Sequence, residues 1–381
     1  MSTTQTRSST QVPISEPRRS ASPVALAVLL LVLAVLVTIA YNARQGAVSP
    51  RIANPAATGV PPRPVEFLSG RSDTAWLVRH QVGCAVMMLL LTVACLRAWR
   101  RQPGHPYVLM VLAATAIVWQ DPIMNWAPYA VYNPQLWHFP EDWPLVRMSP
   151  TVEPFVVIGY STFYFLAPFF SSIWILRRLQ ARASSGSFVW RRPLISMALL
   201  LFVTGFTIDA ALEIFCVHSG LYIYSQVIPW GSLFAGTTFQ FPLIWESSLV
   251  TVVMIPAGVL CYRDDSGRTQ AEKLAQRFRW SRTRPALTTF LVMAGILNLS
   301  YFIYGAGFAA IRASKLATSV ACPYPFPEAK VYDPQGFYER EGQPGPYFEG
   351  HWSRWMTAQP DGRPTVNPVK EDGYCRPGNH A

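Results

Sequence analysis

The sequence predicts an all-α membrane protein, a polytopic bundle of about seven transmembrane helices, from three observations. Of 381 residues, 51% are hydrophobic and only 14% are charged, against about 25% charged residues in a typical soluble domain. The apolar residues occur in blocks long enough to cross a bilayer. Lysine and arginine gather in alternate connections between these blocks, so membrane topology explains the net charge of +11 better than nucleic-acid binding does.

The first span is predicted at residues 23–41, which are almost purely leucine, valine and alanine. Before it, residues 1–22 are rich in serine and threonine and predict a disordered cytoplasmic tail. A cleaved signal peptide is the alternative, but the apolar stretch exceeds the usual h-region of about 7–15 residues, which favours an uncleaved anchor. Residues 42–73 follow as a proline-rich outer loop.

Six further spans are predicted from the remaining apolar blocks, which extends the transmembrane domain over residues 23–311. They cover about residues 74–99, 107–120, 152–176, 193–217, 239–262 and 285–311. The third span leads into a long outer loop at residues 121–151, rich in tryptophan and tyrosine, and loops of this length are often functional. Residues 312–381 hold many prolines and glycines without a period, which predicts an irregular extracytoplasmic tail.

Arginine-rich segments follow the second, fourth and sixth spans, and the N-terminal tail is also basic. This distribution predicts the N-terminus inside and the C-terminus outside the membrane, which we expect to be a bacterial plasma membrane. The C-terminal tail then lies in an oxidising compartment. Cys322 and Cys375 could form a disulfide there, and two free thiols are the alternative.

Five acidic residues lie within or at the ends of predicted spans, where a carboxylate is unfavourable and invites a functional explanation. The topology, which rests on the basic residues alone, places all five in the outer half of the bilayer. They are Asp121, Glu153, Asp209, Glu213 and Glu246. We therefore expect a site at the outer side of the membrane that several spans share.

Asp209 and Glu213 are spaced i, i+4, so they share one face of the fifth span. Two carboxylates on one face in a medium of low dielectric repel each other, so one of them is expected to hold a proton near neutral pH. Gln240 and Glu246 lie about 120° apart around the sixth span, so they can flank a cavity without forming one stripe.

Some of these features also have a purely structural explanation. Asp121 or Glu153 alone could cap a helix end at the interface, and the outer aromatic residues could form an interfacial belt. His138 and His218 are also predicted outside, but they lack the short spacings of common metal motifs. No metal or cofactor is therefore expected.

The sequence resembles the AveC-like spirocyclase family in short blocks that keep their order over about residues 75–310. The blocks are Gln120-Asp121-Pro122 with Asn125, Glu153-Pro154, Asp209 with Glu213, Ser232 to Thr237, Gln240-Phe241-Pro242 with Glu246, and Arg263 to Thr269. The resemblance implies a membrane enzyme that closes a polyketide-like dihydroxy-ketone into a spiroketal with loss of water. The lipid bilayer and a lipophilic small molecule are then the expected partners.

Carboxyl groups suit this chemistry because the departing hydroxyl needs a proton, the oxocarbenium-like cation needs stabilisation, and the attacking hydroxyl must lose a proton. We assign the acid to Asp209 or Glu213, and the base or charge stabiliser to Asp121 or Glu246. The residues expected to bind the substrate are Gln120, Asn125, Glu153 and Gln240.

Two other classes of protein remain open at this point. A proton-coupled carrier of a small or lipophilic solute also uses buried acids in its spans. Against it, the two halves of the chain show no clear internal repeat, although prolines in the fourth and sixth spans keep it open. A non-catalytic membrane scaffold is the third class, and it predicts acids dispersed around the bundle.

Overall fold

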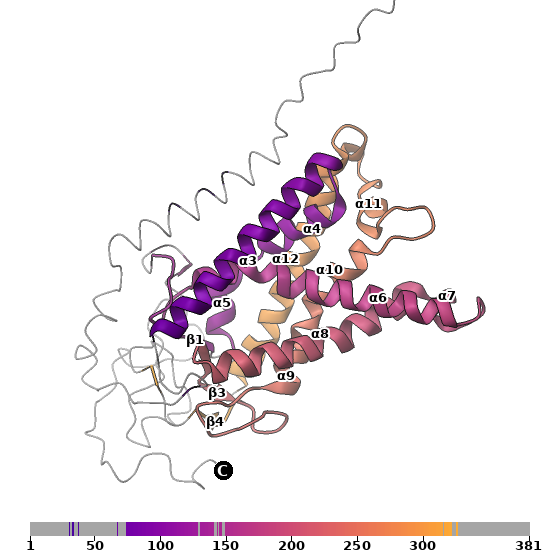
Figure 1. Cartoon of the computed structure of the whole chain (residues 1–381). Coiled ribbons are helices and arrows are strands. Elements are labelled where there is room, and N and C mark those ends of the chain that lie inside the picture. The colour runs from indigo at the N-terminus through magenta and orange to yellow at the C-terminus, as the bar shows by residue number, and fades with distance from the viewer. Residues whose placement is uncertain are drawn as a thin grey trace, which may run out of the picture.

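The computed structural model describes residues 30, 33, 37, 67, 74–128, 130–140, 143, 145–146, 149–314, 316–321 and 325–326. In this part of the chain the fold is mainly helical, and six helices are long and apolar enough to cross a membrane (Figure 1). They are Ala75–Arg101, Pro106–Trp126, Phe155–Arg182, Pro193–His218, Leu243–Cys261 and Pro285–Ala313. The predicted all-α membrane bundle and six of its spans are thus confirmed.

Some predictions fall on residues that the structure does not describe. The predicted first span lies almost entirely outside the described residues, and so do both predicted tails apart from a few positions. Cys322 and Cys375 also lie outside the described residues, so their disulfide stays a prediction. The same holds for the inside-outside orientation, because no membrane is part of the structure.

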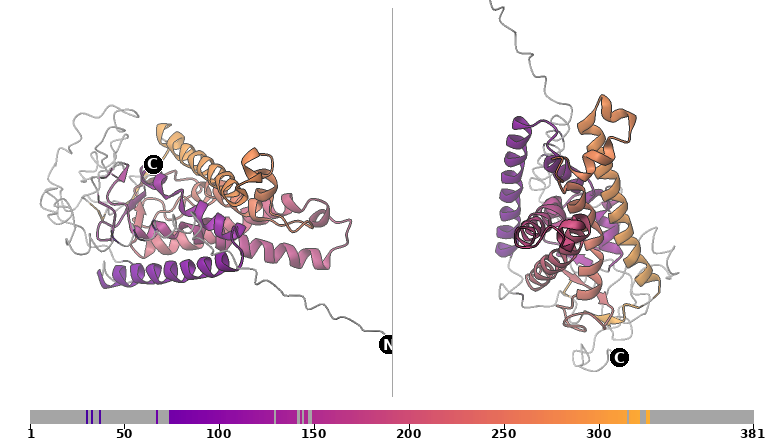
Figure 2. Two further views of the ribbon diagram at one scale, coloured as in Figure 1. Left: turned by 90° about the horizontal axis from the view of Figure 1, so that it is seen from above. Right: turned by 90° about the vertical axis from the view of Figure 1, so that its right-hand side faces the viewer.

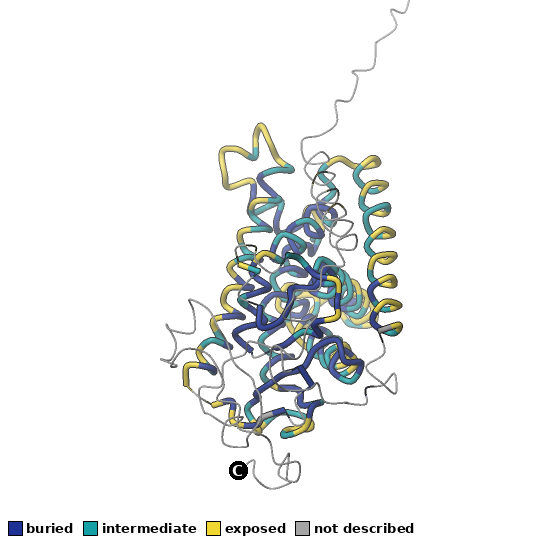
Figure 3. Tube along the Cα trace, turned by 90° about the vertical axis from the view of Figure 1, so that its left-hand side faces the viewer, coloured by how far each residue is buried: buried dark blue, intermediate teal, exposed yellow. Residues whose placement is uncertain are grey.

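Helix α3 (Thr74–Arg101) runs along one side of the bundle (Figures 1 and 2). Much of its surface is exposed, as Figure 3 shows, and the exposed residues include the apolar side chains Val86, Leu89 and Leu90. Exposed apolar side chains at the centre of a membrane span are suited to contact with lipid.

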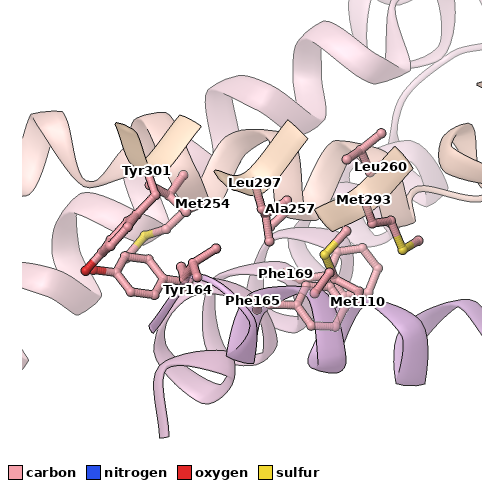
Figure 4. Packing of buried hydrophobic residues seen from close by; sticks show 14 of the residues in the cluster. Met110, Tyr164, Phe165, Phe169, Met254, Ala257, Leu260, Met293, Leu297 and Tyr301 are labelled. Atoms are coloured by element: carbon pink, nitrogen blue, oxygen red, sulfur yellow. The ribbon is translucent and has the colours of Figure 1, made fainter. Parts of the chain in front are cut away.

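The core of the bundle lies between the other spans. Its long helices are α4 (Pro106–Thr115), α6 (Ala167–Arg182), α8 (Pro193–His218), α10 (Thr251–Cys261) and α12 (Pro285–Ala313). Helix α12 packs against α4 and α10, and α8 packs against α6 and α10. Figure 4 shows how side chains from different spans meet there, among them Met110, Phe169, Met254 and Leu297.

The third span continues beyond the predicted end at residue 120. After α4 the chain tightens into the 3-10 helix η2 (Val118–Gln120) and continues as α5 (Asp121–Trp126). Pro122 does not stop the helix, because it lies in the first turn of α5, where a backbone N–H is not needed. Asp121 is therefore a buried helical residue and not the first residue of a loop.

The fourth span is irregular in its first half. A 3-10 helix, η4 (Phe155–Gly159), is followed by a wide π-helical turn, η5 (Thr162–Leu166), before α6 begins. In this turn the N–H of Ala167 donates to the carbonyl of Thr162, five residues back, and Pro168 supplies no N–H to the next position. Such turns often occur at functional sites, and this one carries Tyr164.

The sixth span starts later than predicted, at α9 (Leu243–Leu249), and continues as α10. Residues 239–242 precede it as non-helical chain, in which Phe241 forms an isolated antiparallel bridge with Leu233. Pro242 stands directly before the first helical residue, so Glu246 lies in the first turn of α9.

Short strands close one end of the bundle, here called the strand end (Figure 1). Strands β1 (Ala130–Tyr132) and β2 (Tyr222–Tyr224) are antiparallel, with Ala130 opposite Tyr224 and Tyr132 opposite Tyr222. Strands β3 (Gln226–Val227) and β4 (Ser319–Val320) form a second antiparallel pair. The arginine-rich connections, with α7 (Phe188–Arg191), α11 (Gln270–Ala275) and the 3-10 helix η6 (Arg279–Arg282), lie away from this end.

Candidate functional site

The five acids singled out in the sequence all lie toward the strand end, and the structure gathers them into two groups. The first, here called the Asp121 group, consists of Asp121, Asn125, Ser149 and Glu153. The second, here called the carboxylate triad, consists of Asp209, Glu213 and Glu246.

An amide connects the two carboxyl groups of the Asp121 group. Asn125, one turn after Asp121 on α5, donates from Nδ2 to Asp121 Oδ2 at 3.2 Å and to Glu153 Oε2 at 2.8 Å. The hydroxyl of Ser149 donates to the same Glu153 oxygen at 2.6 Å. One asparagine therefore holds an acid of the third span beside an acid that precedes the fourth.

Two tyrosines complete the environment of Asp121. The hydroxyl of Tyr160 donates to Asp121 Oδ1 at 2.6 Å, and that of Tyr301 on α12 donates to the same oxygen at 2.8 Å. Together with Asn125, three donors point at one carboxyl group. Asp121 thus accepts hydrogen bonds at both of its carboxyl oxygens.

The surroundings of Glu153 favour the protonated form of its carboxyl group. Burial raises the pKa of the Glu153 carboxyl well above its ordinary value of 4.5, and the neighbouring Asp121 carboxylate raises it further. The hydrogen bonds from Ser149 and Asn125 oppose this shift but do not cancel it. The Asp121 group is therefore expected to hold a proton on Glu153.

Glu153→Gln should change how the stability of the protein depends on pH. The folded protein keeps a proton on Glu153 that the unfolded chain releases near the ordinary value, so wild-type stability falls as pH rises above that value. The glutamine cannot release a proton. We expect the free energy of unfolding of Glu153→Gln to gain on that of wild type as pH rises from about 5 to about 8, by up to about 1.4 kcal/mol per pH unit, and the melting temperature to follow it.

The measurement is thermal unfolding in detergent over this pH range. Asp265→Asn serves as the matched control, because Asp265 is an exposed acid far along the chain in an arginine-rich connection. The control should show no such trend. A difference between Glu153→Gln and wild type that stays constant with pH would show that Glu153 is ionised in the folded protein.

The carboxylate triad comes from two spans. Asp209 and Glu213 share one face of α8 as predicted, and Glu246 faces them from α9, with one oxygen of each within 4.8 Å of the others. Asp209 is fully buried, and neither of its oxygens makes a hydrogen bond of normal geometry to the described residues, although Ser247 lies close by. Each of the other two acids accepts one hydrogen bond from a tyrosine.

The hydroxyl of Tyr224 donates to Glu213 Oε2 at 2.9 Å, and the hydroxyl of Tyr304 donates to Glu246 Oε1. In the described part of the chain, none of the three acids forms an ion pair with lysine or arginine. Repulsion between the three carboxylates therefore favours a state in which protons are shared among them.

The triad is also the place where the described side chains could share a cation, because three carboxylate oxygens suit a hard divalent ion. The two histidines considered from the sequence are engaged elsewhere. The Nδ1 atom of His138 lies 2.9 Å from the carbonyl of Phe139, and that of His218 lies 2.9 Å from the carbonyl of Ile214.

Three buried tyrosines lie between the two acid groups. The ring of Tyr301 contacts that of Tyr164 at 5.6 Å and that of Tyr304 at 5.6 Å between centroids. Figure 4 shows the hydroxyl ends of Tyr301 and Tyr164 meeting. Since Tyr301 bonds Asp121 and Tyr304 bonds Glu246, this pair of tyrosines on one helix reaches both groups.

The two glutamines expected at the site make structural contacts instead of contacts with the acids. Gln120 donates to the side-chain oxygen of Asn298 at 3.0 Å and to its carbonyl at 3.2 Å, which ties η2 to α12. Gln240 donates to the carbonyls of Tyr224, Ser225 and Ser319 at 2.9, 3.1 and 3.2 Å. It thereby joins the strands of the strand end and supports Tyr224, which bonds Glu213.

A buried arginine secures the end of α5. Arg312, in the last turn of α12, donates to the carbonyl of Trp126 and lies over the Trp126 ring at 4.4 Å from its centroid. A cation at the carboxyl end of a helix is favourable. It fixes the short helix that carries Asp121 and Asn125.

The residues that the sequence interpretation missed are mainly tyrosines: Tyr160, Tyr164, Tyr224, Tyr301 and Tyr304. In a membrane protein sequence, tyrosines are usually interpreted as ordinary core or interfacial aromatic residues. The spacing of Tyr301 and Tyr304, i and i+3 within an apolar span, was a usable signal, because it puts two hydroxyl groups on one helix face.

The fold and the site define a class of protein, a polytopic helical membrane protein with buried carboxyl groups at one end of its bundle. The profile of the family described as Spirocyclase AveC-like matches residues 99–332, which include both acid groups and the tyrosines between them. The chain therefore belongs to the AveC-like spirocyclase family. No curated protein and no solved structure matches the chain.

Proposed function

We propose that this protein is a spirocyclase that closes a polyketide-like dihydroxy-ketone into a spiroketal with loss of water. The observation that carries the proposal is the presence of two buried carboxyl groupings with different surroundings, joined by tyrosines. The Asp121 carboxyl accepts three hydrogen bonds, whereas Asp209 accepts none of normal geometry from the described residues. Such contrast between neighbouring carboxyl groups is how acid and base roles are divided in other acid-base enzymes.

The reaction begins when one substrate hydroxyl adds to the ketone and forms a hemiketal. In our proposal a protonated member of the triad, Asp209 or Glu213, donates its proton to the hemiketal hydroxyl, which leaves as water. The remaining oxocarbenium-like cation is stabilised by the charge of Glu246. Asp121 then removes the proton from the second hydroxyl as that oxygen bonds to the cationic carbon.

The remaining residues are proposed to position the substrate or the catalytic groups. Asn125 and Glu153 lie beside Asp121 and are proposed to orient substrate oxygens toward it. Gln120 and Gln240 are proposed to contribute through the helices and strands that they hold together. The substrate, being lipophilic, would reach the bundle from the lipid of what we propose is a bacterial plasma membrane.

The proposal is tested with the purified protein in detergent and a synthetic dihydroxy-ketone whose two hydroxyl groups can close two rings. We expect conversion to the spiroketal to exceed the uncatalysed rate and to give one configuration at the spiro carbon. Product with equal amounts of both configurations, formed at the background rate, would contradict the proposal.

The alternative of a proton-coupled carrier is tested with the same preparation. Buried acid groups joined by hydroxyls also suit proton movement across a membrane. Proton-dependent uptake into vesicles by a protein that forms no spiroketal would favour the carrier. The scaffold alternative receives no support from the arrangement of the acids, since they are gathered into two groups and not dispersed.

A further inference from the structure

Each turnover of the proposed reaction moves a proton from one acid group to the other, and our inference about its return rests on that proposed function. In each turnover the triad gives one proton to the departing hydroxyl, and Asp121 receives one from the attacking hydroxyl. The substrate loses only water, so the enzyme is left with a proton on Asp121 and a missing proton at the triad. Before the next turnover, that proton must return from Asp121 to the triad.

The groups that lie between the two sites are tyrosine hydroxyls. Tyr301 donates to Asp121 at 2.8 Å, so it is the direct neighbour of the carboxyl group that must lose its proton. Its ring contacts that of Tyr164 at 5.6 Å between centroids, and the hydroxyl ends of the two side chains meet (Figure 4). Tyr304, beside Tyr301 on α12, donates to Glu246.

A tyrosine hydroxyl can accept a proton on its oxygen while it donates the proton that it already carries. Tyr164 and Tyr301 are buried, at 4% and 1% exposure, so bulk water has little access to the path. A single water molecule can complete the last step from Tyr164 to the triad. The water that the reaction itself releases is of this kind.

We propose that Tyr301 and Tyr164 return the proton from Asp121 to the carboxylate triad after each turnover. The proton on Asp121 passes to the oxygen of Tyr301 as the proton of Tyr301 passes to Tyr164. The proton of Tyr164 then passes to a triad carboxylate, directly or through water. Each tyrosine ends with one proton, no electron is transferred, and the triad is ready to act as an acid again.

Tyr160 offers a matched control within the same site. It donates to the same Asp121 oxygen as Tyr301, at 2.6 Å, so its removal also takes one hydrogen bond from Asp121. The Tyr160 ring also contacts that of Tyr164 at 5.1 Å between centroids, and its hydroxyl lies 3.4 Å from that of Tyr132 in β1. The ring of Tyr132 contacts that of Tyr222 in β2 at 5.3 Å, and Tyr222 lies beside Glu213, so this branch also runs toward the triad. Tyr160→Phe therefore perturbs Asp121 while the hydroxyls of Tyr301 and Tyr164 stay in place, and a burst in this variant would assign the proton return to the Tyr132 branch and overturn the proposed path.

The experiment compares one turnover with many in wild type, Tyr301→Phe, Tyr164→Phe and Tyr160→Phe, with the dihydroxy-ketone of the functional test. Enzyme in excess measures the first turnover, and substrate in excess measures the steady state. In Tyr301→Phe and Tyr164→Phe we expect a burst of about one product per enzyme, followed by a steady rate lower by about tenfold or more. Tyr160→Phe should slow both measurements equally and show no burst.

A second control lies far from both acid groups. Tyr107, on α4, contacts Phe169 and Phe170 and lies beneath Arg263, so Tyr107→Phe should match wild type in both measurements. A further measurement uses wild type alone. If proton return through the tyrosines limits the steady-state rate, the solvent deuterium isotope effect on that rate should be larger than the effect on the first turnover.

The outcomes separate the two proposals. If wild type forms no spiroketal, the proposed function fails and the relay has no basis. If wild type turns over and the two variants lose the same factor in the first turnover and in the steady state, Tyr301 and Tyr164 only position Asp121, and the relay is wrong. If one variant does not fold, the other tests the same path.

Discussion

Asp209→Asn is expected to lower spiroketal formation by about 100-fold or more, because the reaction then lacks a proton donor of the kind that contributes this factor in acid-base catalysis. The change keeps the shape of the side chain and removes only its ability to carry and release a proton. Asp209 is fully buried and has no normal hydrogen bond to the described residues. Few packing contacts should therefore be lost.

The stability of this variant should be equal to that of wild type or higher. An amide removes one of three mutually repelling carboxylates, which are gathered within 4.8 Å of one another. The combination of lost turnover and retained stability separates a functional acid from a structural one. Thermal unfolding and product formation are measured on the same detergent preparation.

Thr207→Val is the matched control for Asp209→Asn. Thr207 lies on the same helix but is exposed, and its hydroxyl donates only to the carbonyl of Val203 one turn before. Its replacement should leave the rate unchanged. If Asp209→Asn and Glu213→Gln both turn over at the wild-type rate, the acid is not on α8, and the proposed mechanism is wrong.

Gly258→Val is expected to destabilise the bundle by about 1–3 kcal/mol, as overpacking of a close helix contact usually does. A Cβ atom at Gly258 would lie 2.6 Å from both Cδ atoms of Leu201, which belongs to α8. Real contacts of a Cβ atom are essentially never that short, so either the buried Leu201 side chain must leave its place or α8 and α10 must move apart. Helix α8 also carries Asp209, so the rate of product formation should fall as well.

Gly295→Val provides the comparison, because a Cβ atom at Gly295 meets nothing within 4 Å. Both glycines lie inside long apolar helices, so the change in helix propensity is similar in the two variants. We expect the melting temperature in detergent to fall for Gly258→Val and to stay near wild type for Gly295→Val. Equal melting temperatures would show that Leu201 can give way at no cost and that α8 and α10 are not tightly packed at this point.

Much of the fold could be predicted from the sequence because hydropathy and helix length are local properties. Six predicted spans are confirmed, and their bounds differ at prolines in the third and sixth spans and at the end of the fourth span, which runs on to Arg182. Pro122 was taken as the end of the third span, yet α5 continues to Trp126. Pro242 stands before the sixth span, which begins only at Leu243. A proline can begin a helix or end one, and the sequence pattern alone does not distinguish the two cases.

Less of the site could be predicted. The shared face of Asp209 and Glu213 follows from helix geometry, and the arrangement of all five acids toward one end follows from the alternation of the spans. The division into two groups does not, because it depends on how each helix is rotated about its own axis. The π-helical turn at η5 also shifts the side chains that follow it by a fraction of a turn, and no simple period reveals such a turn.

The sequence by itself therefore determined that this chain crosses a membrane as helices, where those helices lie, and which carboxyl groups are too buried to be ordinary. Each of these conclusions depends on the free energy of placing a side chain in lipid, which the residue and its near neighbours decide. Only the tertiary structure decided that Asn125 joins Asp121 to Glu153, and that Tyr301 and Tyr304 reach different acid groups. Contacts between residues as distant as Asp121 and Tyr301 depend on how packed helices meet, and packing is a property of the whole bundle.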